Sequence, residues 1–483
     1  MRLIAYMKPY AHWVIFALLL VLGLTAFDLY RPMLVGDAID TFGANGDYDV
    51  IIATAIKYAV VLALSFAFNI AQTWILQKTG QNIILQMRKD LYRHIQSLGS
   101  RYFDITPVGK LVTRVTNDVE ALNEMYSGIL VQLFRNIVKI VGLAGVMLVL
   151  DVRLAAISFV LMPLVIGLTV LCQKIARNIY RLYRTRLTDI NTFLSEHLSG
   201  MKIIQIFGRQ ERKFEEFHDK NTKLYKAFYR EMLMYAVFRP LIYILSILSL
   251  MIVLWFGSRN VFDEIISVGT LYIFSNYIRS FFDPIQELAE QFSTLQSSIA
   301  SAEKIFTVMD EDEFIPEVEN PKQPDKITGK IEFDHVWFAY DGENYVLKDV
   351  SFVINPGEKV AFVGATGAGK SSILNLIGRY YDIQKGHIYI DGIDIRQLSK
   401  KKLRSAIGQM QQDVFIFEGD VAYNIRLNDD DITDAQVKAA AEYVNASHFI
   451  EKLPQGYHEP VTERGATSRQ ESVSYCPRKD TCP

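Results

Sequence analysis

Residues 364–372 read GATGAGKSS and match the pattern G-x-x-x-x-G-K-[ST]. An apolar run at 360–363 precedes this segment, and a helical pattern at 372–377 follows it. A glycine-rich loop between a strand and a helix directs its backbone N–H groups at phosphate oxygens, and the helix N-terminus adds a partial positive charge. The C-terminal part of the chain is therefore predicted to be an α/β domain that binds nucleotide phosphates.

Two side chains of this loop have separate expected roles. Lys370 is expected to pair with the β and γ phosphates, and the Ser371 hydroxyl is expected to bind Mg²⁺. A glycine-rich turn that binds nothing is the alternative, and the strand, lysine, hydroxyl and helix together disfavour it. The predicted nucleotide-binding residues of the loop are Gly364, Ala365, Thr366, Gly367, Ala368, Gly369, Lys370, Ser371 and Ser372.

The flanks of the loop carry two more candidates. Tyr340 ends a strand-like run about 25 residues before the loop, and an aromatic ring there could stack on a nucleotide base. Gln412 lies in a glutamine-rich segment after a strand-like run, where an amide could reach a metal or a water. From the pattern alone, ordinary strand packing for Tyr340 and a solvated loop for Gln412 remain equally open.

The N-terminal half consists of long apolar runs. Runs 9–27, 58–77, 154–173 and 240–258 contain no charged residue, and each is about as long as the roughly 20 residues that a helix needs to cross a bilayer. Two weaker runs, 140–150 and 265–278, are counted as the third and sixth spans. Half of the chain is hydrophobic and its net charge is −2, which excludes a disordered chain and a nucleic-acid-binding protein.

Loop charges predict the orientation of these spans. Residues 37–49 carry four acidic and no basic side chains, whereas 80–125 carry six Lys or Arg and 174–239 carry fourteen. Basic loops stay in the cytoplasm. The N-terminus, both long loops and everything after the sixth span are therefore expected to be cytoplasmic. Polar breaks in the two loops, at 116–118 and 199–202, are candidate tips that touch another domain.

The composition changes after the last span. Residues 310–329 contain three prolines and seven acidic residues, which is typical of a linker. Short strand-like runs follow, among them Lys359–Val363. The expected organisation is a six-span transmembrane domain at 1–309, a linker at 310–329, a partial nucleotide-binding domain at 330–467 and a separate tail at 468–483.

These features together resemble an ATP-binding cassette (ABC) exporter half-transporter of the bacterial multidrug or lipid type, from residue 1 to Thr467. Four segments carry the cytosolic resemblance: VWFAYDGENYVLKDVSFVINPGEKVAFVGATGAGKSS at 336–372, GHIYIDGIDIRQL at 386–398, IGQMQQDVFIFEGDVAYNI at 407–425 and VTERG at 461–465. The resemblance implies that Tyr340 stacks on adenine and that Gln412 senses Mg²⁺ and the attacking water. It also implies that 462–465 contacts coupling helices near 116–118 and 199–202.

The resemblance further implies the fold and the activity. The expected fold is an all-α, six-helix membrane domain followed by an α/β P-loop cassette. Two such halves pair in the plasma membrane, bind ATP and Mg²⁺, and export a drug, lipid or peptide by alternating access; no nucleic acid is involved. Polar residues in the spans are candidate substrate contacts, with helix–helix hydrogen bonding as the alternative: Asn69, Gln72, Asn276, Tyr277 and Arg279.

The resemblance stops after Thr467. The family continues with a signature of the type F-S-x-G-x-R-Q, whereas residues 468–476 read SRQESVSYC. Shifted codons for this segment can encode such a signature, so 468–483 is interpreted as a frameshift tail, which resequencing the gene around the Thr467 codon tests. By resemblance the chain then lacks the Walker B aspartate and the catalytic glutamate, and it is not expected to hydrolyse ATP. A non-hydrolysing subunit of a heterodimeric exporter and a defunct product are the alternatives.

Overall fold

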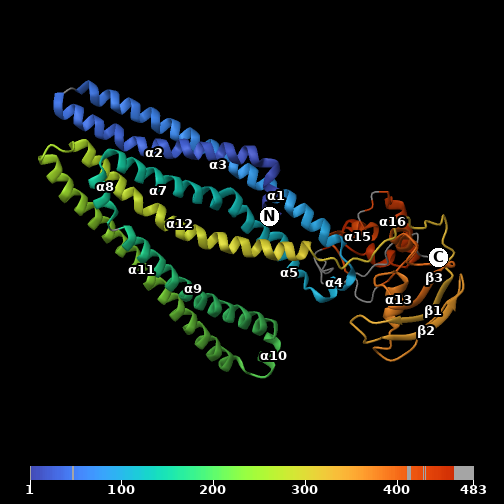
Figure 1. Ribbon diagram of the computed structural model, residues 1–483. Helices are drawn as coiled ribbons and strands as arrows, with labels where there is room; N and C mark the ends of the chain where they lie inside the picture. The colour runs from blue at the N-terminus through green and yellow to red at the C-terminus, as the bar shows by residue number, and fades with distance from the viewer. Residues whose placement is uncertain are drawn as a thin grey trace. The chain divides into compact units, whose positions relative to one another are not determined.

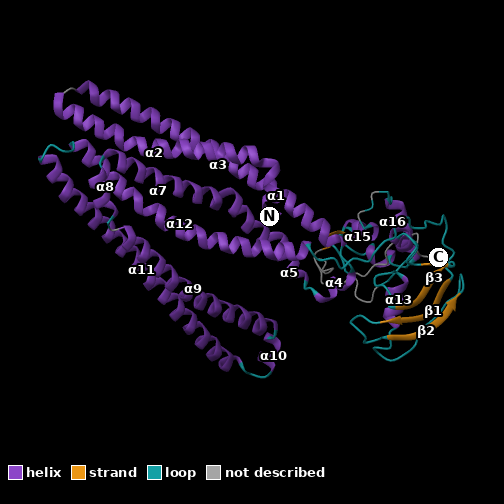
Figure 2. Cartoon of the chain, viewed as in Figure 1, coloured by secondary structure: helices purple, strands orange, loops and turns teal. Residues whose placement is uncertain are grey.

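The computed structural model describes residues 2–45, 48–160, 162–410, 415–427, 429 and 431–461. The chain divides into two compact units. The first, the helical unit, comprises 2–95 and 109–310, and the second, the cassette unit, comprises 96–108 together with the chain from 311 onward. Figure 2 shows that the first unit is helical and that the strands lie in the second.

The helical unit is built from long helices that continue well beyond the apolar runs (Figure 1). Within the described parts of the chain, five segments are long and apolar enough to cross a membrane: Arg2–Gly43, Tyr48–Ser97, Val108–Leu150, Val152–Ser199 and Gln210–Phe262. The helices are α1 (Arg2–Met7), α2 (Ala11–Asn45), α3 (Tyr48–Ser97), α5 (Val108–Thr113), α6 (Val119–Glu124), α7 (Leu130–Leu150), α8 (Val152–Phe159), α9 (Met162–Ser199), α10 (Met201–Ile206), α11 (Gln210–Phe262) and α12 (Val268–Met309).

Helix α12 contains the sixth expected span but is not among the five apolar segments. Polar side chains such as Asn276 and Arg279 interrupt its apolar start. The helix packs against α2, α7 and α11, and its aromatic residues Phe274 and Tyr277 are buried in the main core of the unit. A helix that other helices shield from lipid needs less apolar surface than one that faces lipid, which explains its weak hydropathy.

The prediction that residues 116–118 form a loop tip is wrong. Residues 116–118 lie in a continuous helical stretch, within a π-helical turn at Arg114–Asp118. Asp118 is buried there and accepts hydrogen bonds from Arg114 and, at 2.9 Å, from Ser301 Oγ of α12. The polar run therefore contributes to packing inside the helical unit. The break in the first long loop comes earlier, at α4 (Ser100–Ile105), which belongs to the cassette unit.

The cassette unit has a four-stranded antiparallel sheet in the order β2-β1-β3-β4. Helix α13 (Lys370–Ile377) contributes buried side chains, such as Leu376, to the same core as the sheet. The other elements are β1 (Ile331–Phe338), β2 (Leu347–Ile354), β3 (Lys385–Ile390), β4 (Ile393–Asp394), α14 (Lys400–Ser405), β5 (Gly419–Asp420), α15 (Val421–Arg426), α16 (Asp434–Tyr443), α17 (Ser447–Ile450) and β6 (Pro460–Val461).

Two expected features of this unit differ in the structure. Residues 359–363 carry no strand hydrogen bonds to the strands described in the structure. Phe362 packs against Phe352 of β2, whereas Val363 is 93% exposed. The segment expected to be a linker packs against the cassette unit. Lys322 forms a parallel bridge with Leu398, and Arg379 donates to the backbone oxygen of Pro316 at 2.8 Å.

Candidate nucleotide-binding site

The loop at 364–372 turns sharply at two glycines. Gly367 has a φ of +88° and Gly369 a φ of +86°, a conformation that L-residues with a side chain rarely adopt. A Cβ atom on Gly369 would also lie 2.6 Å from the Leu347 side chain. Helix α13 begins at the next residue, so the glycines bring the chain back onto the sheet and leave the N-terminus of the helix at the loop.

Lys370 folds back over this loop. Its Nζ donates to the carbonyl oxygens of Gly364, at 2.7 Å, and Ala365, at 2.9 Å. These contacts hold the ammonium group over the loop, where phosphate oxygens can replace the two carbonyls. The adjacent hydroxyl of Ser371 is exposed. A lysine, a free hydroxyl and the N–H groups of a glycine-rich loop are the donor set that a nucleotide phosphate with bound Mg²⁺ requires.

Ser372 has a different environment from Ser371. It is buried, and its Oγ lies 3.0 Å from the hydroxyl oxygen of Tyr340. This hydrogen bond connects the end of β1 to the first turn of α13. The structure therefore places Tyr340 beside the phosphate loop, and it assigns the Ser372 side chain to this contact.

Tyr340 belongs to a small aromatic cluster. Its ring meets the rings of Phe338 and Tyr381 edge-on, with centroid distances of 4.7 and 5.0 Å. Tyr381 donates its own hydrogen bond to the carboxylate of Asp104 in α4. Burial, together with this bond to Asp104, raises the pKa of Tyr381 above its usual range. A chain of contacts thus runs within the cassette unit from α4 through two tyrosines to the phosphate loop.

Sequence reasoning missed the role of α4. Besides Asp104, this turn carries Arg101, which lies 3.2 Å from Glu313 and 3.7 Å from Asp341. Gly99 donates its backbone N–H to Glu313 O at 2.8 Å. Gly99 and Pro107 flank the turn and are the local signals of a helix break that could have located it.

Other predicted site residues are not tested by these contacts. Gln412 and the segment 462–465 lie outside the described residues. Among the described residues, no group of three or more His, Cys, Asp or Glu side chains could hold a metal ion. A magnesium ion held by a nucleotide phosphate and one hydroxyl needs no such cluster.

Two candidate substrate contacts have partners inside the helical unit. Tyr277 donates its hydroxyl to Leu29 O at 2.6 Å, and Asn276 donates to Tyr272 O at 3.0 Å. The Tyr277 bond joins α12 to α2, which is the helix–helix alternative that the sequence left open, whereas the Asn276 bond lies within α12 itself.

Comparison with known proteins gives two family matches. Residues 14–285 match the family described as ABC transporter transmembrane region, and residues 347–472 match the family described as ABC transporter. The two matches cover the long helices and the phosphate loop, respectively.

Several curated proteins are similar along most of the chain. A putative ABC transporter ATP-binding protein, exp8, of Streptococcus pneumoniae is 36% identical over 468 residues, which are 96% of this chain and 80% of that protein. A probable multidrug resistance ABC transporter ATP-binding/permease protein, YheH, of Bacillus subtilis is 35% identical, with 85% of this chain and 61% of that protein covered. A fatty acid ABC transporter ATP-binding/permease protein of Mycobacterium tuberculosis is 34% identical, with coverage of 85% and 65%.

Proposed function

The chain belongs to the ABC transporter family, and from that premise we propose that it is the half-subunit of an ATP-driven exporter of hydrophobic or amphipathic molecules. Its helices span the plasma membrane several times and its cassette lies in the cytoplasm. One observation carries the proposal: a glycine-rich loop with Lys370 held over it occurs in the same chain as five apolar membrane-length helices.

The energy source we propose is the differential binding of ATP to two arrangements of a pair of halves. A ligand shifts a conformational equilibrium only by the difference in its affinity for the two states. Lys370 and the N–H groups of the loop bind the phosphates, the Ser371 hydroxyl helps to hold Mg²⁺, and Tyr340 stacks on the adenine. When bound, Mg²⁺ neutralises phosphate charge.

The transported molecule is proposed to be a drug, a lipid or a peptide. The printed names of two relatives, a multidrug resistance transporter and a fatty acid transporter, support this range. The second half is either another copy of this chain or a different ABC half-transporter.

A polypeptide of these 483 residues is proposed to bind ATP without hydrolysing it. Residues 468–476 do not match the signature that the family resemblance leads us to expect after Thr467. In this form the chain acts as a non-hydrolysing partner within a heterodimer, or it is inactive. Phosphate release at an ordinary ABC-transporter rate by the purified polypeptide would overturn this part of the proposal.

Transport by inside-out membrane vesicles tests the exporter function. The vesicles are prepared from the source organism with its native gene or with a Lys370→Ala allele. We expect ATP-dependent accumulation of a fluorescent amphiphile to fall at least severalfold in the mutant vesicles, while Lys359→Ala, outside the loop, leaves it unchanged. Equal accumulation in native and Lys370→Ala vesicles would contradict the exporter assignment.

A further inference from the structure

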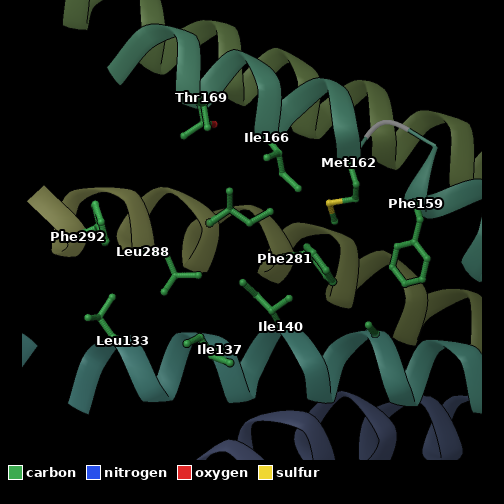
Figure 3. Close-up of a pocket in the computed structure, with 13 residues that line it drawn as sticks. Leu133, Ile137, Ile140, Phe159, Met162, Ile166, Thr169, Phe281, Leu288 and Phe292 are labelled. Atoms are coloured by element: carbon green, nitrogen blue, oxygen red, sulfur yellow. The ribbon is translucent and has the colours of Figure 1, made fainter. Parts of the chain in front are cut away.

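An open apolar slot of about 860 Å³ lies in the helical unit between α7, α12 and the α8–α9 segment, and its lining residues Ile137, Val170 and Phe292 are more than half exposed. Its volume falls in the range of roughly 300–1,000 Å³ that is typical of small-molecule sites. Figure 3 shows its walls: Leu133 to Ile140 on one side, Phe281 to Phe292 on the second and Phe159 to Thr169 on the third. The lining consists of aliphatic and aromatic side chains, a methionine and one hydroxyl, that of Thr169.

The cavity is a slot that runs along the helices. On α7 its lining extends from Leu133 to Ala144, and on α12 from Phe281 to Phe292. At a rise of 1.5 Å per residue, each stretch is ~16 Å long. This is about half of the ~30 Å hydrocarbon thickness of a bilayer, or the depth of one leaflet. The slot therefore matches the length of one acyl chain.

A second, polar pocket adjoins the slot. It measures about 440 Å³, lies between α9, α11 and α12, and shares Thr169 with the slot. Its lining includes Arg177, Glu290 and several hydroxyl groups. Arg177 and Glu290 are both exposed at the mouth of this pocket, and neither makes a salt bridge within the described part of the helical unit. Along α12 the polar pocket extends from Gln286 to Ser297, whereas the slot extends from Phe281 to Phe292. Because α12 continues toward the cytoplasmic cassette, the polar pocket lies beside the cytoplasmic half of the slot and continues beyond it.

Thr169 lies where the slot meets the polar pocket. The residue is 3% exposed, and its Oγ1 has no hydrogen-bond partner among the residues that the structure describes. Helical threonines usually bond to the carbonyl four residues earlier, as Thr185 and Thr294 do here. A buried hydroxyl without a partner costs free energy, and a polar group of a ligand at the junction would supply one.

We propose that the slot and the pocket together bind a single-chain acyl amphiphile with a zwitterionic head group. The tail lies along α7 and α12 toward Ala144, and the head lies between Arg177 and Glu290, with Thr169 donating to an oxygen at the head–tail junction. One unpaired cation and one unpaired anion complement a head that carries both charges. The inference rests on the proposed exporter function and specifies the class of its substrate and the leaflet from which the substrate enters.

Photolabelling tests the direction of binding. The chain is reconstituted in nanodiscs and exposed to hexadecanoyl lysophosphatidylcholine that carries a diazirine either at the end of its tail or next to its head. The tail probe is expected to label residues around Ala144 and Phe159, and the head probe residues around Cys172. Val141 lies on the same helix as Ala144 but outside the slot, and it is 65% exposed. Reversed labelling by the two probes, or labelling of Val141 equal to that of the slot residues, would overturn the proposal.

Variants test the slot independently. Ala144→Trp fills the tail end and is expected to weaken lysophosphatidylcholine binding at least tenfold, whereas Val141→Trp on the same helix leaves binding unchanged. Thr169→Val changes no volume and is expected to weaken binding severalfold, which keeps the test valid if the tryptophan variant fails to fold. Unchanged binding in both slot variants would overturn the proposal. Labelled cross-links from the slot to a second copy of the chain would also overturn it, because they would show that the slot is a subunit interface.

The head assignment has its own controls. Arg177→Gln and Glu290→Gln should each weaken binding of the zwitterionic lipid severalfold, and Arg181→Gln, on α9 but outside the pocket, should not. Palmitate and hexadecyltrimethylammonium, each with a single charge, should bind more weakly than the lysolipid. ATP photolabelling of the same samples distinguishes a failure of this inference from a failure of the proposed exporter function. A chain that binds ATP but not the lysolipid overturns this inference alone. A chain that binds no ATP overturns the exporter function.

Discussion

At the scale of single residues, the phosphate loop is preorganised by contacts that a nucleotide can exchange. Lys370 already lies over the loop and donates to two of its carbonyls, so little side-chain entropy is lost when phosphate oxygens replace them. Tyr340 is positioned by its hydroxyl contact to Ser372 and by the edges of two aromatic rings. Both side chains are therefore held near the loop before any ligand arrives.

Substitution of Tyr340 separates stacking from positioning. Tyr340→Ala removes the ring and should weaken ATP binding about tenfold, since stacking on a base contributes about 1–3 kcal/mol. Tyr340→Phe keeps the ring and should retain most of the affinity. Competition titrations against a fluorescent ATP analogue measure both values. Tripolyphosphate has no base, so an equal loss of its affinity in Tyr340→Ala would show that the tyrosine only shapes the loop.

Asp394 gives the cassette unit an acid-sensitive element. Burial alone would raise the pKa of its carboxyl, but hydrogen bonds from Arg396 and His387 outweigh burial and lower it to about 2. A carboxylate whose pKa is lower in the folded state stabilises the fold above its unfolded pKa, near 3.9. This stabilisation is lost as the pH falls from about 4 toward 2.

Asp394→Asn should therefore lower the urea midpoint of the cassette unit at pH 5 and flatten its decline between pH 4 and pH 2. Trp337 is the one tryptophan of that unit, and its fluorescence reports unfolding once the other three are replaced by phenylalanine. Asp325→Asn, at an exposed carboxylate of the same unit, is the matched control. Parallel pH profiles for the native chain and Asp394→Asn would refute this account.

At the scale of elements, α4 is tied to the cassette unit by side chains that are distant in sequence. Asp104 and Tyr381 are 277 residues apart, and a hydrogen bond to a charged group contributes about 1.5–3 kcal/mol. A double-mutant cycle with Asp104→Asn and Tyr381→Phe should give a coupling free energy of about 1 kcal/mol or more. Urea unfolding followed by Trp337 fluorescence measures it, and additive effects of the two substitutions would contradict the contact.

The crossing of α2 and α12 depends on two glycines. A Cβ atom on Gly269 would lie 2.1 Å from Gly36 O and 2.4 Å from a carboxylate oxygen of Asp40. Gly269→Val should therefore force the helices apart and lower the thermal midpoint of the detergent-solubilised chain by several degrees. Gly43→Val, at a helical glycine with no atom within 4 Å, is the control. Equal midpoints for the two variants would contradict the close crossing.

The elements also show which features the sequence predicts well. Long uncharged runs at 58–77 and 240–258 predicted membrane helices, because bilayer thickness sets the length of such a run. The prediction of a tip at 116–118 was wrong because Ser301 of α12 and the neighbouring Arg114 donate hydrogen bonds to the buried carboxylate of Asp118. The prediction of a strand at 359–363 was wrong because strand pairing depends on residues that are distant in sequence. The local pattern of apolar residues does not show whether a partner strand is available.

At the scale of the whole molecule, the local part of the candidate site was predictable and the long-range part was not. The loop at 364–372 is contiguous, so its spacing alone specifies the glycines and Lys370. The contacts of Tyr340 with Ser372, and of Tyr381 with Asp104, join segments that only the fold brings together. The role of Gln412 remains a prediction, because that residue lies outside the described part of the chain.

Equilibrium binding of ATP to the 483-residue chain in nanodiscs tests the central claim most directly. With Mg²⁺ present, we expect one ATP per chain, at least hundredfold weaker binding in Lys370→Ala, and unchanged binding in Lys359→Ala. Carbonate-washed membranes should retain the protein throughout. Absence of ATP binding by the membrane-inserted chain, or binding that does not depend on Lys370, would contradict the account.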